Sequence, residues 1–449
     1  MKSKLFIILT VIFLLSIFFT QFKLINRPVR DNDEGIYLTS FLLVDRGFPA
    51  YKKTYFSQPP GFLLSVYPGF IVFGKTLQAA RLTISLWSIV GLLAIIWIGF
   101  ELKNKWAGLL VVVLLYLIPV YYNQALTFQS DVLITTFSLI SFGALLRFGK
   151  KINVFWFIVS VFFLNLAFWT KFDVTFFPSF SLFMYLQFKE RKISLIDIFN
   201  YFLIFCTVSL GFFLIFILPF GIKEIFNNSI LLRFQASSSS SSSFMLFDYL
   251  KNDVILLLTT LASLFLIIFN VKNIKYPINI VFIWSIFILS ILIFYRPLFP
   301  HHLVMLAVPM VLLFSFLLKK ISHYLVIILI IITLINRSYL FFNTSSSLVD
   351  SQRQEVINII KNNTSINDFV VSDEEIINGI SGRLPPPELS DVSHVRIRSN
   401  NLSPENFKKI IEQYKPKLII PLNGRLQSIK NFNDVTKDYE NINNILWYK

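Results

Sequence analysis

The chain has 449 residues, of which 55% are hydrophobic and only 15% are charged, and 51 of them are phenylalanine. Soluble globular proteins contain about 45–50% apolar and about 25% charged residues, so this composition excludes an ordinary soluble protein. It equally excludes a disordered or fibrous chain. The formal net charge of +16 would suggest a nucleic-acid partner unless the charges have another role. The single cysteine, Cys206, excludes a disulfide framework within the chain. We therefore predict a polytopic α-helical membrane protein.

Eleven apolar stretches are long enough, or nearly so, to cross the hydrocarbon core as helices, which takes about 20 residues. They are residues 5–25, 81–100, 106–123, 131–147, 153–170, 172–188, 196–220, 253–271, 277–295, 303–318 and 321–342. The fifth and sixth are joined at residues 170–173 and form either two spans or a re-entrant pair. We interpret the first as a retained anchor, because it is too long for a cleaved signal and no small-residue cleavage site follows it.

Lysine and arginine in the short loops predict the sidedness of these spans. With the N-terminus in the cytoplasm, the cytoplasmic loops and helix ends carry 14 basic and three acidic residues, whereas the region from residue 345 onward is neutral, with 13 of each. Most of the positive charge is therefore a topology signal, and the nucleic-acid interpretation loses its main support. We predict a plasma-membrane protein with a cytoplasmic N-terminus and an extracytoplasmic C-terminal domain.

Composition also predicts the domain organisation. Residues 1–344 form the transmembrane domain, with a first extracytoplasmic loop over 26–80 and another outer loop over 221–252. The serine run 237–243 in the second loop predicts a flexible segment.

Residues 345–449 change in character and predict a small soluble α/β domain. Its pattern suggests a helix near 348–360, strands near 369–371 and 417–421, and a helix capped by Ser403 with Pro404 at its first position.

Almost no charge lies in mid-span, where it would cost at least ~2.5–3.5 kcal/mol, and the candidate polar residues crowd the predicted outer ends of the spans. In the first outer loop, Asp33 and Glu34 are adjacent acids that point in different directions on any regular backbone. One can therefore act on a substrate while the other orients a neighbouring group. The alternative is a solvated loop whose acids only balance its arginines.

Further polar groups occur at the outer starts and ends of later spans. Asp131 begins the fourth span, where it could simply complement the helix dipole, and Lys171 and Asp173 could pair with each other at the end of the fifth. Arg296 with His301 and His302 suits an anionic ligand. The two histidines are not at metal-ligand spacing from any Cys, Asp or Glu. No metal is predicted and no cofactor is required, although a divalent metal is left open.

The sequence contains no phosphate-binding glycine loop, Rossmann fingerprint, nucleophile elbow or His-Glu-x-x-His motif, so nucleotide chemistry is not indicated. What remains is a set of acids and cations from four distant parts of the chain at one membrane face. This pattern suits a substrate with an anionic head at the outer surface and an apolar tail in the bilayer.

Several motifs occur in a fixed order between residues 26 and 342. They are Asp33-Glu34-Gly35-Ile36-Tyr37, the pair Gly47 and Tyr51, Pro59-Pro60, Arg81, Asp131, Leu166-Ala167-Phe168-Trp169-Thr170-Lys171, and His301-His302-Leu303 running to Pro309. Together they resemble the membrane-embedded glycosyltransferases of the GT-C superfamily, which use polyprenyl-phosphate sugars. The similar branch is that of the protein O-mannosyltransferases and the lipid A aminoarabinose transferases.

The resemblance implies an inverting transfer of a sugar from a polyprenyl-phosphate donor to a protein, lipid or glycan acceptor at the outer face. It implies Asp33 as the general base, Asp131 as its assistant, and Glu34 as an orienting carboxylate. The implied donor-phosphate ligands are Lys171, Arg296, His302, Arg81 and His301, and the implied substrate-binding residues are Tyr37, Tyr55 and Gln58. Many relatives carry lysine where this chain has Gln58, so the phosphate contact of that lysine must come from another cation.

Three alternatives stay open at this point. The first is transfer of another lipid-linked group on the same scaffold. The second is a transporter or flippase of lipid-linked sugars, although transporters favour charges and broken helices near the membrane midplane. The third is a non-catalytic assembly partner.

Overall fold

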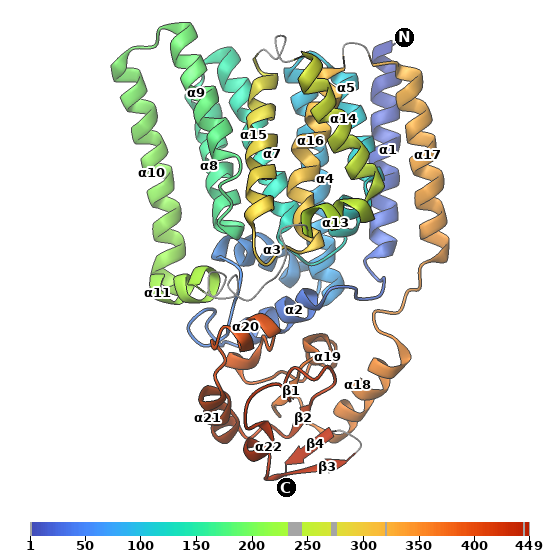
Figure 1. Ribbon diagram of the computed structural model, residues 1–449, viewed down its shortest axis with the longest axis vertical. Helices are drawn as coiled ribbons and strands as arrows, with labels where there is room; N and C mark the ends of the chain where they lie inside the picture. The colour runs from blue at the N-terminus through green and yellow to red at the C-terminus, as the bar shows by residue number, and fades with distance from the viewer. Residues whose placement is uncertain (1, 232–244, 271–275, 319–320, 443–444, 449) are drawn as a thin grey trace. The chain divides into compact units, whose positions relative to one another are not determined.

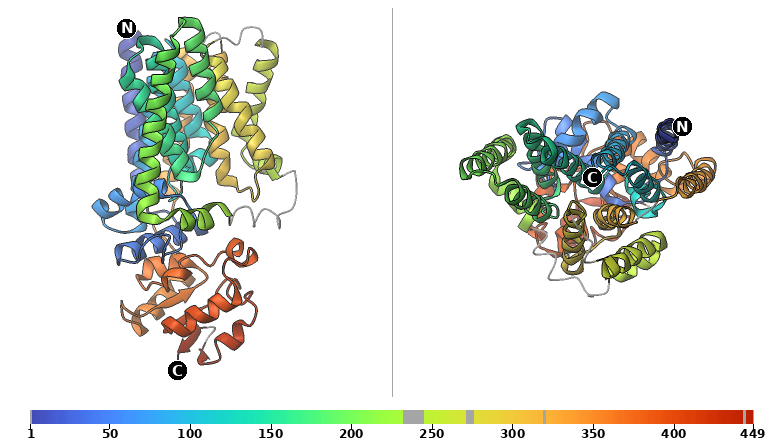
Figure 2. Two further views of the ribbon diagram at one scale, coloured as in Figure 1. Left: turned by 90° about the vertical axis from the view of Figure 1, so that its left-hand side faces the viewer. Right: turned by 90° about the horizontal axis from the view of Figure 1, so that it is seen from above.

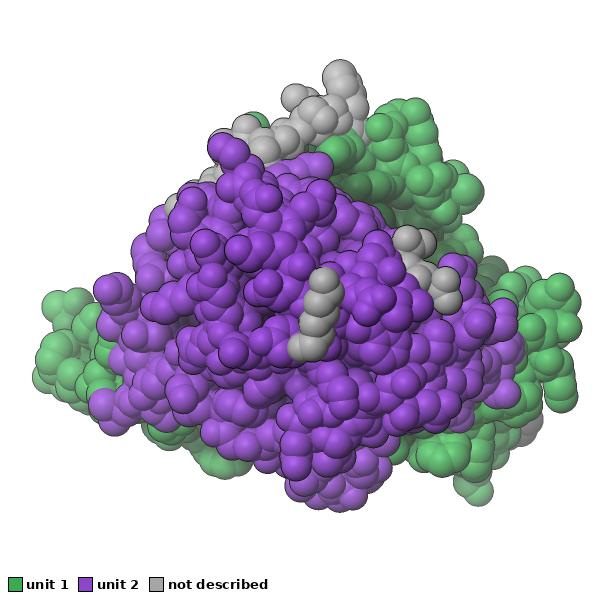
Figure 3. Space-filling view, turned by 90° about the horizontal axis from the view of Figure 1, so that it is seen from below, with its two compact units in different colours: residues 1–25, 82–215, 242–344 green, residues 26–81, 216–241, 345–449 purple. Residues whose placement is uncertain are grey.

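The computed structural model describes residues 2–231, 245–270, 276–318, 321–442 and 445–448, and it divides into two compact units (Figures 1 and 3). Unit 1 contains residues 1–25, 82–215 and 242–344, and unit 2 contains residues 26–81, 216–241 and 345–449. Composition alone divides the chain at residue 344, whereas the structure groups the first predicted outer loop with the C-terminal residues. The serine run 237–243 lies outside the described residues.

Unit 1 is a bundle of helices, seen end-on in the right-hand view of Figure 2. Its described helices, of which α4 begins and α10 ends in unit 2, are α1 (Lys2–Leu24), α4 (Leu77–Glu101), α5 (Lys105–Leu117), α6 (Pro119–Gln124), α7 (Asp131–Lys151), α8 (Val154–Lys171), α9 (Phe177–Arg191), α10 (Leu195–Phe220), α13 (Met245–Asn252), α14 (Val254–Asn270), α15 (Ile278–Phe294), η3 (Pro300–His302), α16 (Leu303–Leu317) and α17 (His323–Asn343).

Each of the eleven predicted apolar stretches is helical over most of its length in the described residues. Among the residues that the structure describes, seven helices are long and apolar enough to cross a membrane, and the count becomes eight if α13 and α14, which are bent by 114° at their break, form one broken span. The shorter apolar helices include α5 and α15. The chain is therefore a multi-pass membrane protein, while the number of eleven spans stays a prediction.

Two helix breaks in unit 1 are held by buried charged side chains. Pro119 supplies no N–H group, so the chain breaks between α5 and α6 and leaves carbonyl groups to be satisfied. Arg337 of α17 donates to two of them, those of Tyr116 and Leu117. Asp253, at the break between α13 and α14, accepts the N–H of Val120 at 2.9 Å. These bonds fix α6, the short helix that precedes Asp131.

Unit 2 combines short helices with one small sheet. Its described elements are α2 (Asn32–Asp45), α3 (Pro60–Phe73), α11 (Ile222–Ile225), η1 (Phe226–Leu231), α18 (Ser351–Asn363), β1 (Val370–Ser372), α19 (Glu375–Ser381), η4 (Pro387–Leu389), α20 (His394–Arg398), α21 (Pro404–Tyr414), β2 (Leu418–Ile420), α22 (Phe432–Val435), β3 (Tyr439–Ile442) and β4 (Ile445–Tyr448).

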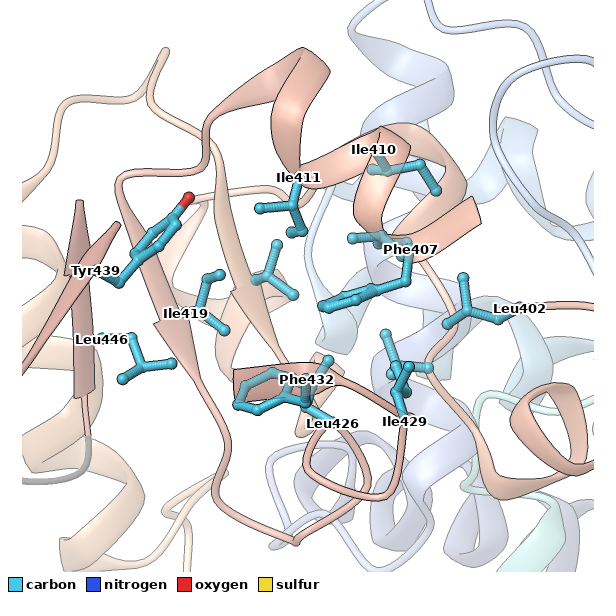
Figure 4. Close-up of a cluster of buried hydrophobic side chains, with 13 residues drawn as sticks. Leu402, Phe407, Ile410, Ile411, Ile419, Leu426, Ile429, Phe432, Tyr439 and Leu446 are labelled. Atoms are coloured by element: carbon cyan, nitrogen blue, oxygen red, sulfur yellow. The ribbon is translucent and has the colours of Figure 1, made fainter. Parts of the chain in front are cut away.

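The sheet has the strand order β1-β2-β4-β3. Strands β1 and β2 are parallel, with Val371 opposite Ile419, and β4 pairs antiparallel with both β2 and β3. Apolar side chains from the sheet and from the helix α21 form a common core, in which Phe407 stacks on Phe432 (Figure 4). The small α/β fold predicted for this region is therefore present.

The cap predicted for α21 is also present. Ser403 accepts the N–H of Asn406 and Pro404 occupies the first helical position, where its missing N–H costs nothing.

Candidate active site

The acids Asp33 and Glu34 lie in the first turn of α2. The helix begins there because the side chain of Asp31 accepts the N–H of Asp33 at 3.0 Å and so caps the helix. The N-terminal end of a helix stabilises negative charge, which suits two adjacent carboxylates. Successive residues of an α-helix point about 100° apart, so the two side chains diverge. The helix therefore gives the Asp33 and Glu34 side chains the different directions expected from the sequence.

Glu34 forms a buried, bidentate ion pair with Arg81 in α4. The Nε and Nη2 atoms of Arg81 lie 2.7 and 2.6 Å from the two carboxylate oxygens of Glu34, and the side chains are 0% and 1% exposed, respectively. The remaining Nη1 donates to the carbonyl of Arg27 at 2.6 Å. Such a pair fixes both partners in one geometry. Asp33, by contrast, is half-buried and reaches solvent.

The predicted substrate-binding residues Tyr37, Tyr55 and Gln58 are all buried within unit 2. Gln58 donates from Nε2 to the hydroxyl of Tyr37 at 2.6 Å, and the hydroxyl of Tyr55 donates to the carbonyl of Asn228 at 3.3 Å. The structure therefore brings Tyr37 and Gln58 together. It also reveals Asn228, a partner that no local pattern in the sequence indicates.

A second buried ion pair occurs in unit 1, where α7 and α8 pack as an antiparallel hairpin. This packing places the first residue of α7 beside the last residue of α8, and Lys171 lies 2.6 Å from Asp131 with exposures of 5% and 1%. The suggestion that Lys171 pairs with Asp173 is therefore wrong. Asp173 instead accepts the N–H and the hydroxyl of Thr175, and burial raises the pKa of its carboxyl to about 6.

The remaining predicted cations surround the start of α16. His302 is buried, and its Nδ1 accepts the N–H of Phe299 at 3.1 Å. The neutral ring therefore carries its proton on Nε2, which makes that atom a donor. Arg296 donates to the carbonyl of Tyr295 at 2.7 Å, and the ring of His301 stacks on Phe299.

In the part of the chain that the structure describes, no group of three or more His, Cys, Asp or Glu side chains is placed to hold a metal ion. The predicted site residues thus fall into three clusters. The first is Asp33, Glu34 and Arg81 with Tyr37, Tyr55 and Gln58, the second is Asp131 with Lys171, and the third is Arg296 with His301 and His302.

Residues 57–222 match the family model described as dolichyl-phosphate-mannose-protein mannosyltransferase. The matched segment includes Gln58, Arg81, Asp131 and Lys171 and begins after Asp33. No curated protein sequence matches the chain significantly.

Solved structures share the fold along nearly the whole chain. ArnT from Cupriavidus metallidurans bound to undecaprenyl phosphate is 12% identical, with a TM-score of 0.68 over 95% of each chain. The same protein in the apo state is 11% identical, with the same TM-score over 95% of this chain and 94% of that one. The archaeal oligosaccharyltransferase AglB from Archaeoglobus fulgidus, in complex with an inhibitory peptide and a dolichol-phosphate, is 11% identical. Its TM-score is 0.55 over 98% of this chain and 72% of AglB. Over nearly its whole length the chain therefore has the fold that ArnT and AglB share, and its residues 57–222 are similar to the dolichyl-phosphate-mannose-protein mannosyltransferase family.

Proposed function

We propose that the protein is an inverting glycosyltransferase that moves a sugar from a polyprenyl-phosphate donor to a hydroxyl or amine acceptor at the extracytoplasmic face of the plasma membrane. The observation that carries this proposal is the difference between the surroundings of Asp33 and those of Glu34. Glu34 is neutralised by Arg81, whereas the adjacent Asp33 reaches solvent at the start of the same helix.

The donor class is supported by the two similar proteins. The ArnT structure holds undecaprenyl phosphate and the AglB structure holds a dolichol-phosphate, and both are polyprenyl phosphates. A multi-pass helical protein suits such a donor, because the isoprenoid tail stays in the bilayer while the phosphate lies at the surface. The protein, lipid or glycan acceptor is not specified by either comparison.

In the proposed reaction, Asp33 takes the proton of the acceptor hydroxyl or amine as that atom attacks the anomeric carbon. The bond between the anomeric carbon and the phosphate oxygen breaks, and its electron pair leaves with the polyprenyl phosphate. Attack from the face opposite the phosphate inverts the anomeric configuration. The leaving phosphate is stable as an anion, so no general acid is required.

Stabilisation of the departing phosphate is assigned to Arg296, which supplies the positive charge, and to His301 and His302, which supply hydrogen-bond donors. Arg81 and Lys171 are each engaged by a carboxylate, so we assign them to holding Glu34 and Asp131 in place. Nε2 of His302 is a hydrogen-bond donor, as a phosphate oxygen requires. Fixed donors of this kind are typically worth several kcal/mol in a transition state.

The test is group transfer by the purified chain from a panel of labelled polyprenyl-phosphate sugars and of polyprenyl lipids that carry a non-sugar group, with Asp33→Asn as the variant. Loss of a general base reduces turnover by about 10²–10⁴-fold. Asp45→Asn is the matched control, because Asp45 is the last residue of the same helix and pairs at the surface with Lys75. Normal turnover by Asp33→Asn would remove the assignment. Transfer of only a non-sugar lipid-linked group would instead favour another activity of the scaffold.

A further inference from the structure

The C-terminal residues 345–449 make close contacts with the segment that carries Asp33, within the same unit. Helix α19 crosses α2 at two glycines. A methyl group at Gly35 would overlap the backbone of Ile376, and one at Gly379 would lie 2.6 Å from a side-chain carbon of Leu38. Thr39 adds a buried hydrogen bond of 2.9 Å to the carbonyl of Glu375. The two helices are therefore in backbone contact immediately beside Asp33 and Glu34.

Further along the same segment, Tyr55 is held on several sides by C-terminal residues. Its N–H donates to the carbonyl of Pro387 at 3.2 Å, and its carbonyl accepts the hydroxyl of Ser390 at 2.9 Å. The guanidinium carbon of Arg396 lies 3.7 Å from the centre of its ring, which is a cation–π contact. Tyr55 lies three residues before Gln58, so these contacts set the position of the Tyr37–Gln58 pair.

Arg396 is itself held rigidly. It is buried, and its Nη1 donates to the carbonyls of Glu388 and Asp391 at 2.7 and 2.6 Å. Its Nε donates to the side chain of Asn401 at 2.8 Å. A guanidinium held by three hydrogen bonds to residues on either side of α20 presents an immobile face to the ring of Tyr55. An adaptable surface arginine would not constrain the ring in this way.

We propose that residues 345–449 position the active-site segment 29–58, and that Arg396 is the positioning residue that acts through Tyr55. The catalytic part of this inference rests on the proposed function, while its structural part does not. Displacement of reacting groups by about 1 Å costs as much as about 10²-fold in rate. The C-terminal region then contributes to turnover without touching the substrate.

The experiment compares full-length wild type with Arg396→Ala and the control Arg398→Ala, which removes an exposed arginine from the same short helix. Hydrogen–deuterium exchange is followed in the peptide that contains the Tyr55 amide and in peptides of α7. We expect Arg396→Ala to exchange about tenfold faster at Tyr55 with α7 unchanged, since a desolvated cation–π contact contributes enough to hold a local structure closed. Transfer should fall by about 10–10²-fold, and Arg398→Ala should match wild type.

Arg396→Lys keeps a cation above the ring and should recover part of both losses, a rescue that general destabilisation would not produce. If Arg396→Ala does not fold, Ser390→Ala tests whether the C-terminal residues hold Tyr55, because it removes only their bond to the Tyr55 carbonyl, and Arg396→Lys then tests the arginine itself. Wild-type exchange at Tyr55 in the Arg396→Ala protein would overturn the proposal, as would faster exchange with undiminished transfer. If the wild-type chain transfers no sugar, the proposed function fails, while the exchange measurement still decides whether the C-terminal residues hold this segment.

Discussion

The buried pair of Arg81 and Glu34 allows a quantitative test of how the acids at the start of α2 are held. Glu34→Met replaces the carboxylate by an apolar side chain of similar length, so the Arg81 guanidinium is left buried without a counter-charge. Arg81→Met leaves the Glu34 carboxylate buried without a counter-charge and also removes the donor to the Arg27 carbonyl. The double variant with methionine at both positions removes both charges.

The side chains of Arg81 and Glu34 are 0% and 1% exposed, so the expected loss of stability is that of a fully buried ion pair. Removing one partner of a fully buried ion pair costs about 3–5 kcal/mol, because the other charge is left uncompensated. Arg81→Met adds about 1–3 kcal/mol for the carbonyl that loses its hydrogen bond. Replacing both partners by apolar side chains is often close to neutral. The double variant should therefore be more stable than the sum of the single changes by about 6–10 kcal/mol, because each single change leaves an uncompensated charge that the double variant does not.

The assay is the free energy of unfolding of the detergent-solubilised protein, measured for the wild type, the single variants and the double variant. Lys75→Met is the control, since Lys75 pairs with Asp45 in the same unit but the two side chains are 47% and 22% exposed. An exposed pair contributes about 0.2–1 kcal/mol. The reasoning is refuted if Glu34→Met costs no more than Lys75→Met, or if the effects of Glu34→Met and Arg81→Met simply add.

Two predictions concern unit 1. Lys171→Met leaves the 1% exposed Asp131 without its cation and should lower the free energy of unfolding by about 3–5 kcal/mol, whereas adding Asp131→Leu should restore most of it. Because burial raises the pKa of Asp173 from 3.8 to about 6, the folded protein holds that proton more tightly than the unfolded chain. Stability should therefore fall by on the order of 2–3 kcal/mol as pH rises from about 4 to about 6. Asp173→Asn should flatten this part of a pH–stability curve, and an unchanged slope would contradict the assignment.

The helices were predictable from the sequence because apolar runs of about 20 residues leave the backbone few alternatives in a membrane. The breaks within them were only partly predictable. Pro119 predicts the interruption between α5 and α6, but no local sequence pattern predicts the bend at Asp253 between α13 and α14. It depends on the N–H group of Val120, 133 residues away in the sequence. Local patterns cannot report such a partner.

In the candidate site, too, local sequence patterns do not predict partners that are distant in the sequence. The motif residues themselves were identified from the sequence, but their partners were not. Lys171 and Asp173 are two residues apart in the sequence, which suggested an ion pair between them. Lys171 is instead the last residue of α8 and pairs with Asp131, 40 residues earlier, across the hairpin of α7 and α8. The same applies to the contacts between Tyr55 and residues near 390, which only the fold brings together.

Gln58 bears on which residues supply positive charge to the phosphate of the proposed donor. In relatives with lysine at this position, a cation would enter a buried environment and would require an anion beside it. Here Gln58 is neutral and its Nε2 donates to the Tyr37 hydroxyl, so this position lacks the positive charge that a lysine would offer to a phosphate. Arg81 and Lys171 are already matched by Glu34 and Asp131, and each pair contributes little net charge to a ligand. We therefore expect the charge that a lipid phosphate demands to come from Arg296, with the two histidines at the start of α16 as hydrogen-bond donors. The donor site of this chain should then depend on these three residues more strongly than the site of a relative that keeps the lysine.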